Sequence, residues 1–190
     1  QNVRFIEKDL NRIFGSTTKT TAEDKRATEL EVLLKRSRFV VDIHQTIEPT
    51  ASPFFIFGYD TKSFVMAHTI APSLPIISYS LEERKDNGLV ATGYTIENGS
   101  VAVTIELGQK GFDHTQLDLG YGVCRRAYWY VKNQRLHMIK NFLLSFFLRR
   151  SKPHSDDKVM VFSYRHPNEG DLNDLKPGYT NFMKIQKGEK

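Results

Sequence analysis

The sequence predicts an α/β fold in which a sheet of parallel character lies beside helices. Short runs of β-branched and aromatic residues recur along the chain, and segments of helical length separate them. Glycine and proline stand at several of the boundaries. Strands that alternate with helices are typical of a parallel sheet. The 190 residues suffice for one such domain with a small appendage.

The first 36 residues predict a loop followed by a helix. Residues 1–20 are polar and read as an extended or loop segment. Thr20 and Glu23 have the spacing of a capping box. Apolar residues at helical spacing follow, so we expect a helix over residues 21–36.

Apolar runs predict the strands of the sheet. They cover residues 39–43, 54–57, 75–79, 101–105 and 159–164. The first run ends just before His44, and the fourth ends just before Glu106. Each of these polar side chains is therefore expected at the carboxyl end of a strand.

Helical segments are expected between and after the strands. They cover residues 61–69, 117–130 and 131–150. The most apolar stretch, residues 136–148, is interrupted by Lys140 and is shorter than the roughly 20 residues that a membrane helix needs. We therefore expect a buried helix there and no membrane contact.

A polar stretch around Pro153 predicts a boundary within the chain. We expect residues 1–150 to form one unit, and residues 151–190 to form a linker and the start of a second, β-rich unit. The chain enters a dense polar motif directly after Gln1, which suggests that it is part of a longer protein.

The amino-acid composition limits the classes of binding partner that we expect. Charged residues make up 26% of the chain, and the formal charge is +5, which suits anionic ligands but does not by itself indicate a nucleic-acid-binding protein. No motif of interleaved aromatic and basic residues supports such binding. The single cysteine, Cys124, cannot form an internal disulfide or a cysteine-rich zinc site. A reducing cytoplasm is the expected location.

His44 and Glu106 are the candidate chemical groups. Ligands of open α/β sheets bind outside the carboxyl ends of the strands, where both residues are expected. His44 could be a zinc ligand, or a hydrogen-bonded histidine without a metal. Glu106 could activate a water molecule, or could be a salt-bridged strand end.

The loop before the first helix holds a second candidate group. Arg4, Asn11 and Arg12 could bind a carboxylate or stabilise an oxyanion. The alternative is that Arg12 pairs with Asp9 and the group fixes a turn.

Four motifs in order resemble the succinylglutamate desuccinylase/aspartoacylase family. Arg4-x4-Asp9-Leu10-Asn11-Arg12-Ile13-Phe14-Gly15 is similar to the family's Arg…Asp-Leu/Met-Asn-Arg-x-Phe motif. Residues 26–31, 42–44 and 105–108 are similar to the helix that follows it, to the strand with the third zinc ligand and to the strand with the catalytic glutamate. The resemblance runs from Arg4 to about Gly111. Residues 175–182 and 187–189 resemble the start of the family's C-terminal β-domain.

This resemblance implies a carboxypeptidase-like fold, with a mixed sheet flanked by helices. It also implies zinc-dependent hydrolysis of the amide bond of a small anionic N-acyl amino acid. His44 would bind zinc, and Glu106 would act as general base and then as general acid. Asn11 and Arg12 would bind a substrate carboxylate, and Arg4 would assist at the carbonyl oxygen.

The chain departs from the family pattern in two ways. The family's first two zinc ligands come from a His-x-x-Glu motif upstream of Asn11, so we expect this chain to bind zinc poorly by itself. His166 and Glu169 repeat that spacing, but we favour a chance match in a turn. Glu48 follows the ligand histidine, and residues 91–99 lack an arginine, so the pattern selects neither of the two named substrates.

Two other functions are compatible with these residues. A carboxypeptidase-like metallopeptidase would use the same histidine, asparagine, arginine and glutamate. A non-catalytic module that binds an anionic ligand could keep the fold without the reaction. Exposed apolar surface would also permit a homo-oligomer.

Overall fold

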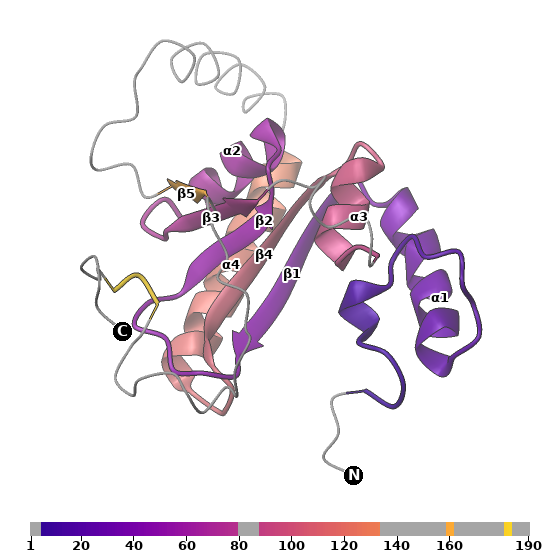
Figure 1. The fold of residues 1–190 in the computed structure, drawn as a ribbon. Helices are drawn as coiled ribbons and strands as arrows, with labels where there is room; N and C mark the ends of the chain where they lie inside the picture. The colour runs from indigo at the N-terminus through magenta and orange to yellow at the C-terminus, as the bar shows by residue number, and fades with distance from the viewer. Residues whose placement is uncertain (1–4, 80–87, 134–158, 162–180, 184–190) are drawn as a thin grey trace.

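The computed structural model describes residues 5–79, 88–133, 159–161 and 181–183. Within these ranges it contains one five-stranded mixed sheet with helices on both faces (Figure 1). The expected class, an α/β fold with a mixed sheet, is confirmed. None of the described helices has the length and apolarity that crossing a membrane would need.

The sheet has the order β1-β4-β2-β3-β5. Its strands are β1 (Phe39–Thr46), β2 (Phe54–Gly58), β3 (Ile76–Tyr79), β4 (Val101–Gln109) and β5 (Val159–Val161). β1 is parallel to β4, and β2 is antiparallel to β4. β3 is parallel to both β2 and β5. The single antiparallel pair makes the sheet mixed.

The main hydrophobic core lies between one face of the sheet and two helices, α2 (Thr61–Ile70) and α4 (His114–Lys132). Alternate residues of β4 point into it, because side chains alternate across a strand. Its sheet side includes Phe55, Phe57, Ile76, Val101, Val103, Ile105 and Leu107. Its helix side includes Met66, Ala67, Ile70, Val123, Ala127 and Tyr130.

The opposite face of the sheet carries α3 (Ala91–Glu97). The buried hydroxyls of Thr92 on α3 and Thr104 on β4 are 3.0 Å apart. The helix α1 (Ala22–Arg36) lies outside α3, at the edge of the molecule (Figure 1). A second, smaller cluster joins α1, α3 and the preceding loop, and consists of Ile13, Phe14, Ala27, Leu89 and Tyr94.

The helix predicted over residues 21–36 is confirmed as α1, but its capping box lies one residue later than predicted. Thr21 is the N-cap, and its side chain and that of Asp24 form the reciprocal pair. Glu23 instead accepts hydrogen bonds from the backbone N–H groups of Ile6 and Glu7. The side chain that turns inward is therefore Asp24, because the loop before α1 occupies Glu23.

Two strands extend several residues beyond their predicted ends. β1 extends to Thr46 and β4 to Gln109, so His44 and Glu106 lie within strands and not after them. The backbones keep pairing past the apolar runs, with a register shift between His44 and Thr46. Ladder hydrogen bonds do not depend on side-chain polarity, so the apolar pattern underestimated both strands.

The helix predicted to start at residue 117 begins earlier and continues past residue 130. Asp113 caps α4 by accepting hydrogen bonds from the N–H groups of Thr115 and Gln116, and these bonds lower the pKa of Asp113. The predicted boundary between residues 130 and 131 is wrong, because α4 runs to Lys132. The predicted helix over residues 131–150 otherwise lies outside the described residues.

The strand predicted over residues 159–164 is described over three residues, as β5. β5 pairs with β3 and so belongs to the main sheet. This position differs from the prediction, which placed these residues in a second, β-rich unit. The rest of the predicted division at residue 150 falls mostly outside the described residues and stays a prediction.

Candidate active site

His44 and Glu106 are direct register partners on β1 and β4. Neighbouring parallel strands lie about 4.8 Å apart, and residues in register project to the same face. This is the face that α3 covers in part, opposite the main core. Both side chains are partly exposed. The structure therefore brings together the two groups that the sequence singled out.

Asp42 orients the His44 ring. It lies two residues before His44 on the same face of β1, and its Oδ2 is 3.0 Å from His44 Nε2. A carboxylate accepts hydrogen bonds, so this contact favours a proton on Nε2. In the neutral ring, Nδ1 then carries the lone pair that a metal ion needs. Metal-binding histidines commonly have such a carboxylate behind them.

Asn11 connects His44 to the start of α3. It lies in a short 3-10 helix, η1 (Leu10–Arg12), where its backbone N–H donates to Asp9 Oδ1 at 3.0 Å. Its side-chain Oδ1 accepts from Ala91 N at 2.8 Å, and its Nδ2 is 3.4 Å from His44 Nε2. α3 has no side-chain cap of its own, so Asn11 supplies an acceptor for its first N–H group from 80 residues away.

Arg12 is exposed beside Asn11. Its guanidinium donates to the Asn11 carbonyl oxygen at 2.6 Å, and this bond uses one of the five N–H donors of the guanidinium. Asp9, the expected alternative partner of Arg12, uses its carboxylate to cap η1. The geometry is thus compatible with an anion bound by Arg12.

Three predicted site residues lie outside the described residues. They are Arg4, His166 and Glu169, and their placement stays a prediction. Sequence reasoning missed Asp42 as a group that orients His44, although the two-residue spacing on a strand places both on one face. It also missed the Ala91 N–H, for which no local sequence signal exists.

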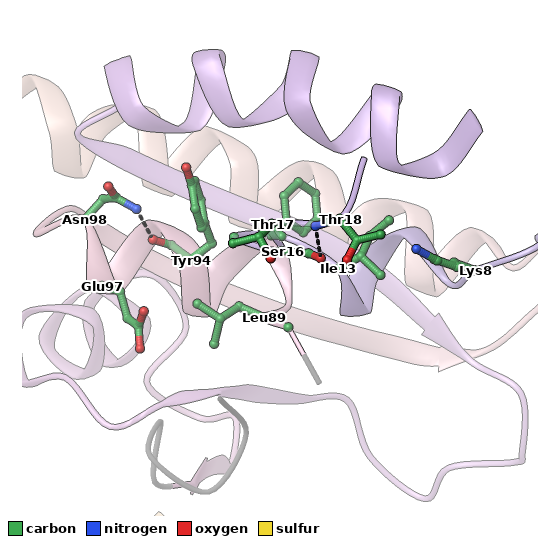
Figure 2. A pocket seen from close by; sticks show the side chains of 12 residues that line it. Lys8, Ile13, Ser16, Thr17, Thr18, Leu89, Tyr94, Glu97 and Asn98 are labelled. Carbon is green, nitrogen blue, oxygen red and sulfur yellow. Dashed lines mark hydrogen bonds between the residues drawn. The ribbon is translucent and has the colours of Figure 1, made fainter. Parts of the chain in front are cut away.

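The described part of the chain also contains a cavity of about 780 Å³ (Figure 2). It lies between α3 and the loop after η1, and its lining includes Lys8, Tyr94, Glu97 and Asn98. His44, Glu106, Asn11 and Arg12 do not line it. The convergence of chemical groups on the face of β1 and β4 that α3 covers in part, and not this cavity, therefore defines the candidate site.

Comparison of the sequence with models of protein families shows to which family the chain belongs. The sequence model of the "Succinylglutamate desuccinylase/Aspartoacylase catalytic domain" matches residues 1–119. The chain belongs to this family. The match includes β1, β4, η1 and the residues that lie together at the candidate site. No curated protein matches the sequence.

Solved structures agree with the family at the level of the fold. A succinylglutamate desuccinylase/aspartoacylase from Rhodobacter sphaeroides has a TM-score of 0.52 at 18% identity, with 63% of this chain and 36% of that chain covered.

Two desuccinylases cover more of the chain. The one from Chromobacterium violaceum has a TM-score of 0.59 at 18% identity, with 95% of this chain and 58% of that chain covered. The one from Vibrio parahaemolyticus has a TM-score of 0.58 at 18% identity, with 98% of this chain and 55% of that chain covered. The chain therefore spans between 36% and 58% of the length of these three relatives.

Proposed function

We propose that this chain carries catalytic residues of a zinc-dependent deacylase that hydrolyses the amide bond of an N-acyl amino acid. The observation that carries the proposal is the register pairing of His44 with Glu106. The contact of Asn11 with His44 adds the Asn11–Arg12 motif to the same place. Membership of the deacylase family supports the reaction class.

Glu106 is the proton-transfer group in this proposal. As a water oxygen attacks the carbonyl carbon, the Glu106 carboxylate accepts a proton from that water. It returns the proton to the amide nitrogen as the carbon–nitrogen bond breaks. The products are a carboxylate and an amine. Arg12 binds a carboxylate of the substrate, and Asn11 completes that site next to His44.

The described residues fit one zinc ligand and not a complete zinc site. Asp42 leaves His44 Nδ1 suited to a metal ion. Among the residues that the structure describes, however, no three His, Cys, Asp or Glu side chains converge. A catalytic zinc ion uses three protein ligands, so the others would have to come from outside these ranges.

Replacing Glu106 by glutamine tests the proposed proton transfer. Glutamine keeps the shape but cannot accept a proton, so we expect kcat to fall by about two to four orders of magnitude. The affinity for a non-hydrolysed succinate probe should stay within about twofold, because that contact is assigned to Arg12. The measurement is the turnover of N-acyl amino acids by the full-length protein that contains this chain, in the presence of zinc.

Glu29→Gln is the matched control, because Glu29 is exposed and its ion pair within the described part of the chain is with Arg26 of the same helix. An unchanged rate in Glu106→Gln would remove Glu106 from the reaction. A panel of peptides beside the N-acyl amino acids defines the substrate class. Cleavage of peptides alone would replace the deacylase proposal by a carboxypeptidase-like peptidase.

A further inference from the structure

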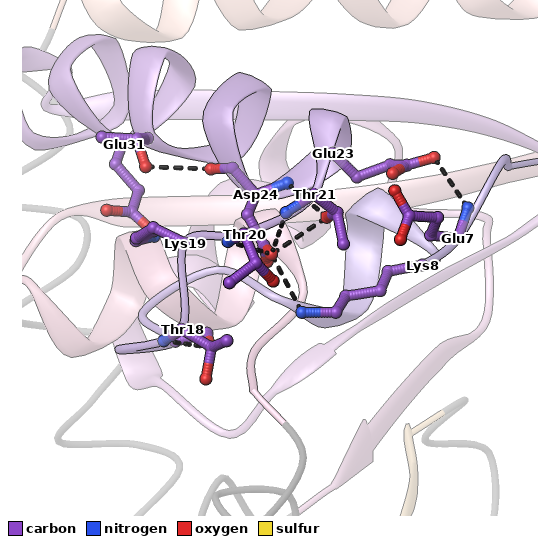
Figure 3. A network of polar contacts seen from close by, with 11 residues as sticks. Glu7, Lys8, Thr18, Lys19, Thr20, Thr21, Glu23, Asp24 and Glu31 are labelled. Carbon is purple, nitrogen blue, oxygen red and sulfur yellow. Dashed lines mark hydrogen bonds and ion pairs between the residues drawn. The ribbon is translucent and has the colours of Figure 1, made fainter.

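Glu23 of α1 holds the chain just before the Asn11–Arg12 motif (Figure 3). Its Oε1 accepts a hydrogen bond from Ile6 N at 2.7 Å and from Glu7 N at 3.2 Å. The backbone N–H of Ile6 is the first cause of a lowered pKa for Glu23. The segment that leads into η1 is therefore tied to the start of α1 by a charged acceptor.

Asp24 holds the chain on both sides of the motif. Its side chain is fully buried, and its Oδ2 is 2.9 Å from Lys8 Nζ, which precedes η1. Thr20 and Thr21 follow η1. The same oxygen of Asp24 accepts hydrogen bonds from Thr20 N at 3.0 Å and from Thr21 N and Oγ1 at 2.9 Å. The Thr21 N–H, and after it Lys8, lower the pKa of Asp24 far below its usual value of 3.8.

Glu31, two turns further along α1, holds the far side of the loop. Its Oε1 accepts from Gly15 N at 2.9 Å and lies 3.4 Å from Lys19 Nζ. Three carboxylates on one helix thus bind backbone or lysine groups before and after η1.

The motif itself makes its contacts on the opposite side. Asn11 reaches Ala91 and His44, and Phe14 exchanges backbone hydrogen bonds with Leu89 at 3.1 and 2.9 Å. The loop is therefore held between α1 on one side and the start of α3 on the other.

We propose that α1 is a positioning helix for the Asn11–Arg12 motif, and that Asp24 is the positioning residue on which the motif's geometry chiefly depends. Hydrogen bonds to a buried charged acceptor are stronger than neutral ones, and of the three described carboxylates it is Asp24 that binds both flanks of the motif. The consequence for Arg12 as an anion-binding group rests on the proposed function.

The variant Asp24→Asn tests this role with little change in shape. It keeps an acceptor oxygen but removes the charge that Lys8 and the Thr20 and Thr21 N–H groups bind. Glu29→Gln removes one exposed charge from the same helix and serves as the control. Lys8→Met, which replaces the partly exposed cation, serves as a second variant if Asp24→Asn does not fold.

Amide hydrogen exchange in the 190-residue chain is the first readout. The Asn11 and Phe14 amides bond to Asp9 and Leu89 and not to Asp24. We expect both to exchange at least about tenfold faster in Asp24→Asn, whereas the Ile105 amide in β4 stays unchanged. Lys8→Met should act in the same direction with a smaller effect, and Glu29→Gln should match the wild type.

Two outcomes would overturn the positioning role. Faster exchange confined to Thr20 and Thr21 would mean that Asp24 stabilises only its own cap. Equally faster exchange at Ile105 would mean that the substitution weakens the whole domain.

Succinate binding is the second readout, with Arg12→Gln as the reference. If Arg12 binds anions, both Asp24→Asn and Arg12→Gln should weaken succinate affinity severalfold, and Glu29→Gln should not. Arg12→Gln could keep the wild-type succinate affinity while the Asn11 and Phe14 amides exchange faster in Asp24→Asn. This result would support the positioning role and overturn the anion-binding part of the proposed function. Wild-type succinate affinity in Asp24→Asn, with affinity lost in Arg12→Gln, would overturn the functional part of the positioning role.

Discussion

His44 is held on the Nε2 side of its ring by two neighbours of different chemistry. Asp42 Oδ2 is an acceptor at 3.0 Å, and Asn11 Nδ2 is a donor at 3.4 Å. One ring nitrogen cannot donate to Asp42 and accept from Asn11 at once, and the shorter contact favours donation to Asp42. The ring orientation therefore follows from β1 itself, with Asn11 as a weaker second contact.

Replacement of Asp42 by alanine should change the tautomer of His44. Without the carboxylate, the preference for a proton on Nε2 is lost, and Asn11 Nδ2 can donate to that nitrogen instead. The measurement is the pair of ring ¹⁵N chemical shifts of His44, at a pH where the ring is neutral. Unchanged shifts would show that Asp42 does not set the tautomer, and Asp60→Ala, at the N-cap of α2, is the control.

Asp24 should make the stability of the fold depend on acid pH. Its pKa in the folded chain lies below the usual 3.8, so folding favours the ionised form. This contribution is complete above pH 3.8 and is lost as the pH falls from there toward the lower folded value.

Melting temperatures measured from about pH 7 to about pH 3 test this sign. The Tm of the wild type should fall further than that of Asp24→Asn over this range. The two curves of Tm against pH should therefore converge in acid. A constant difference between the curves at all pH values would contradict the linkage.

At the scale of elements, α1 has a side-chain cap at its start and three carboxylates that contact the preceding loop. Its first turn is closed by Thr21, whose hydroxyl accepts from the Asp24 N–H at 3.1 Å. The same face contributes Ala27, which lies between these carboxylates and is fully buried in the smaller cluster. The helix is therefore fixed both by packing and by polar contacts with the loop that carries Asn11.

Thr21→Ala should destabilise the chain by about 1 kcal/mol, the usual cost of losing a helix N-cap hydroxyl. Urea unfolding at neutral pH is the measurement. Thr18→Ala, in the same loop but exposed, is the control and should change the free energy of unfolding by less than about 0.5 kcal/mol. Equal effects of the two substitutions would show that the cap contributes nothing particular.

At the scale of the whole molecule, β4 is the strand around which the fold is organised. It pairs with β1 and β2, and its alternate residues enter the main core under α2 and α4. Glu106 lies on the other face of this same strand. The position of the candidate catalytic carboxylate therefore depends on the integrity of the core behind it.

Ile105→Ala should destabilise the whole chain by about 2 to 5 kcal/mol, because Ile105 is fully buried in the main core. Ile47→Ala, at an isoleucine that is 69% exposed, should cost less than about 0.5 kcal/mol. Calorimetry of both variants is the measurement. A small loss in Ile105→Ala would mean that the site face can hold its geometry without this core.

Local pattern by itself determined most strands and α1. Phe39–Ile43 and Val101–Ile105 are mostly apolar and largely β-branched, and Ala27, Leu30 and Leu34 repeat at helical spacing, so these elements follow from neighbours in the chain. The motifs around Asn11, His44 and Glu106 likewise indicate the family without knowledge of their contacts.

Only the tertiary structure decided α3, the inward turn of Asp24 and the meeting of Asn11 with His44. The segment Ala91–Glu97 contains threonines and a glycine, which are weak helix formers, and its first N–H is capped by Asn11 from far along the chain. Asp24 is buried because Lys8 and the loop N–H groups bind it, whereas its sequence neighbours give no reason to prefer it to Glu23. Each of these features depends on partners distant in sequence, and no local pattern contains them.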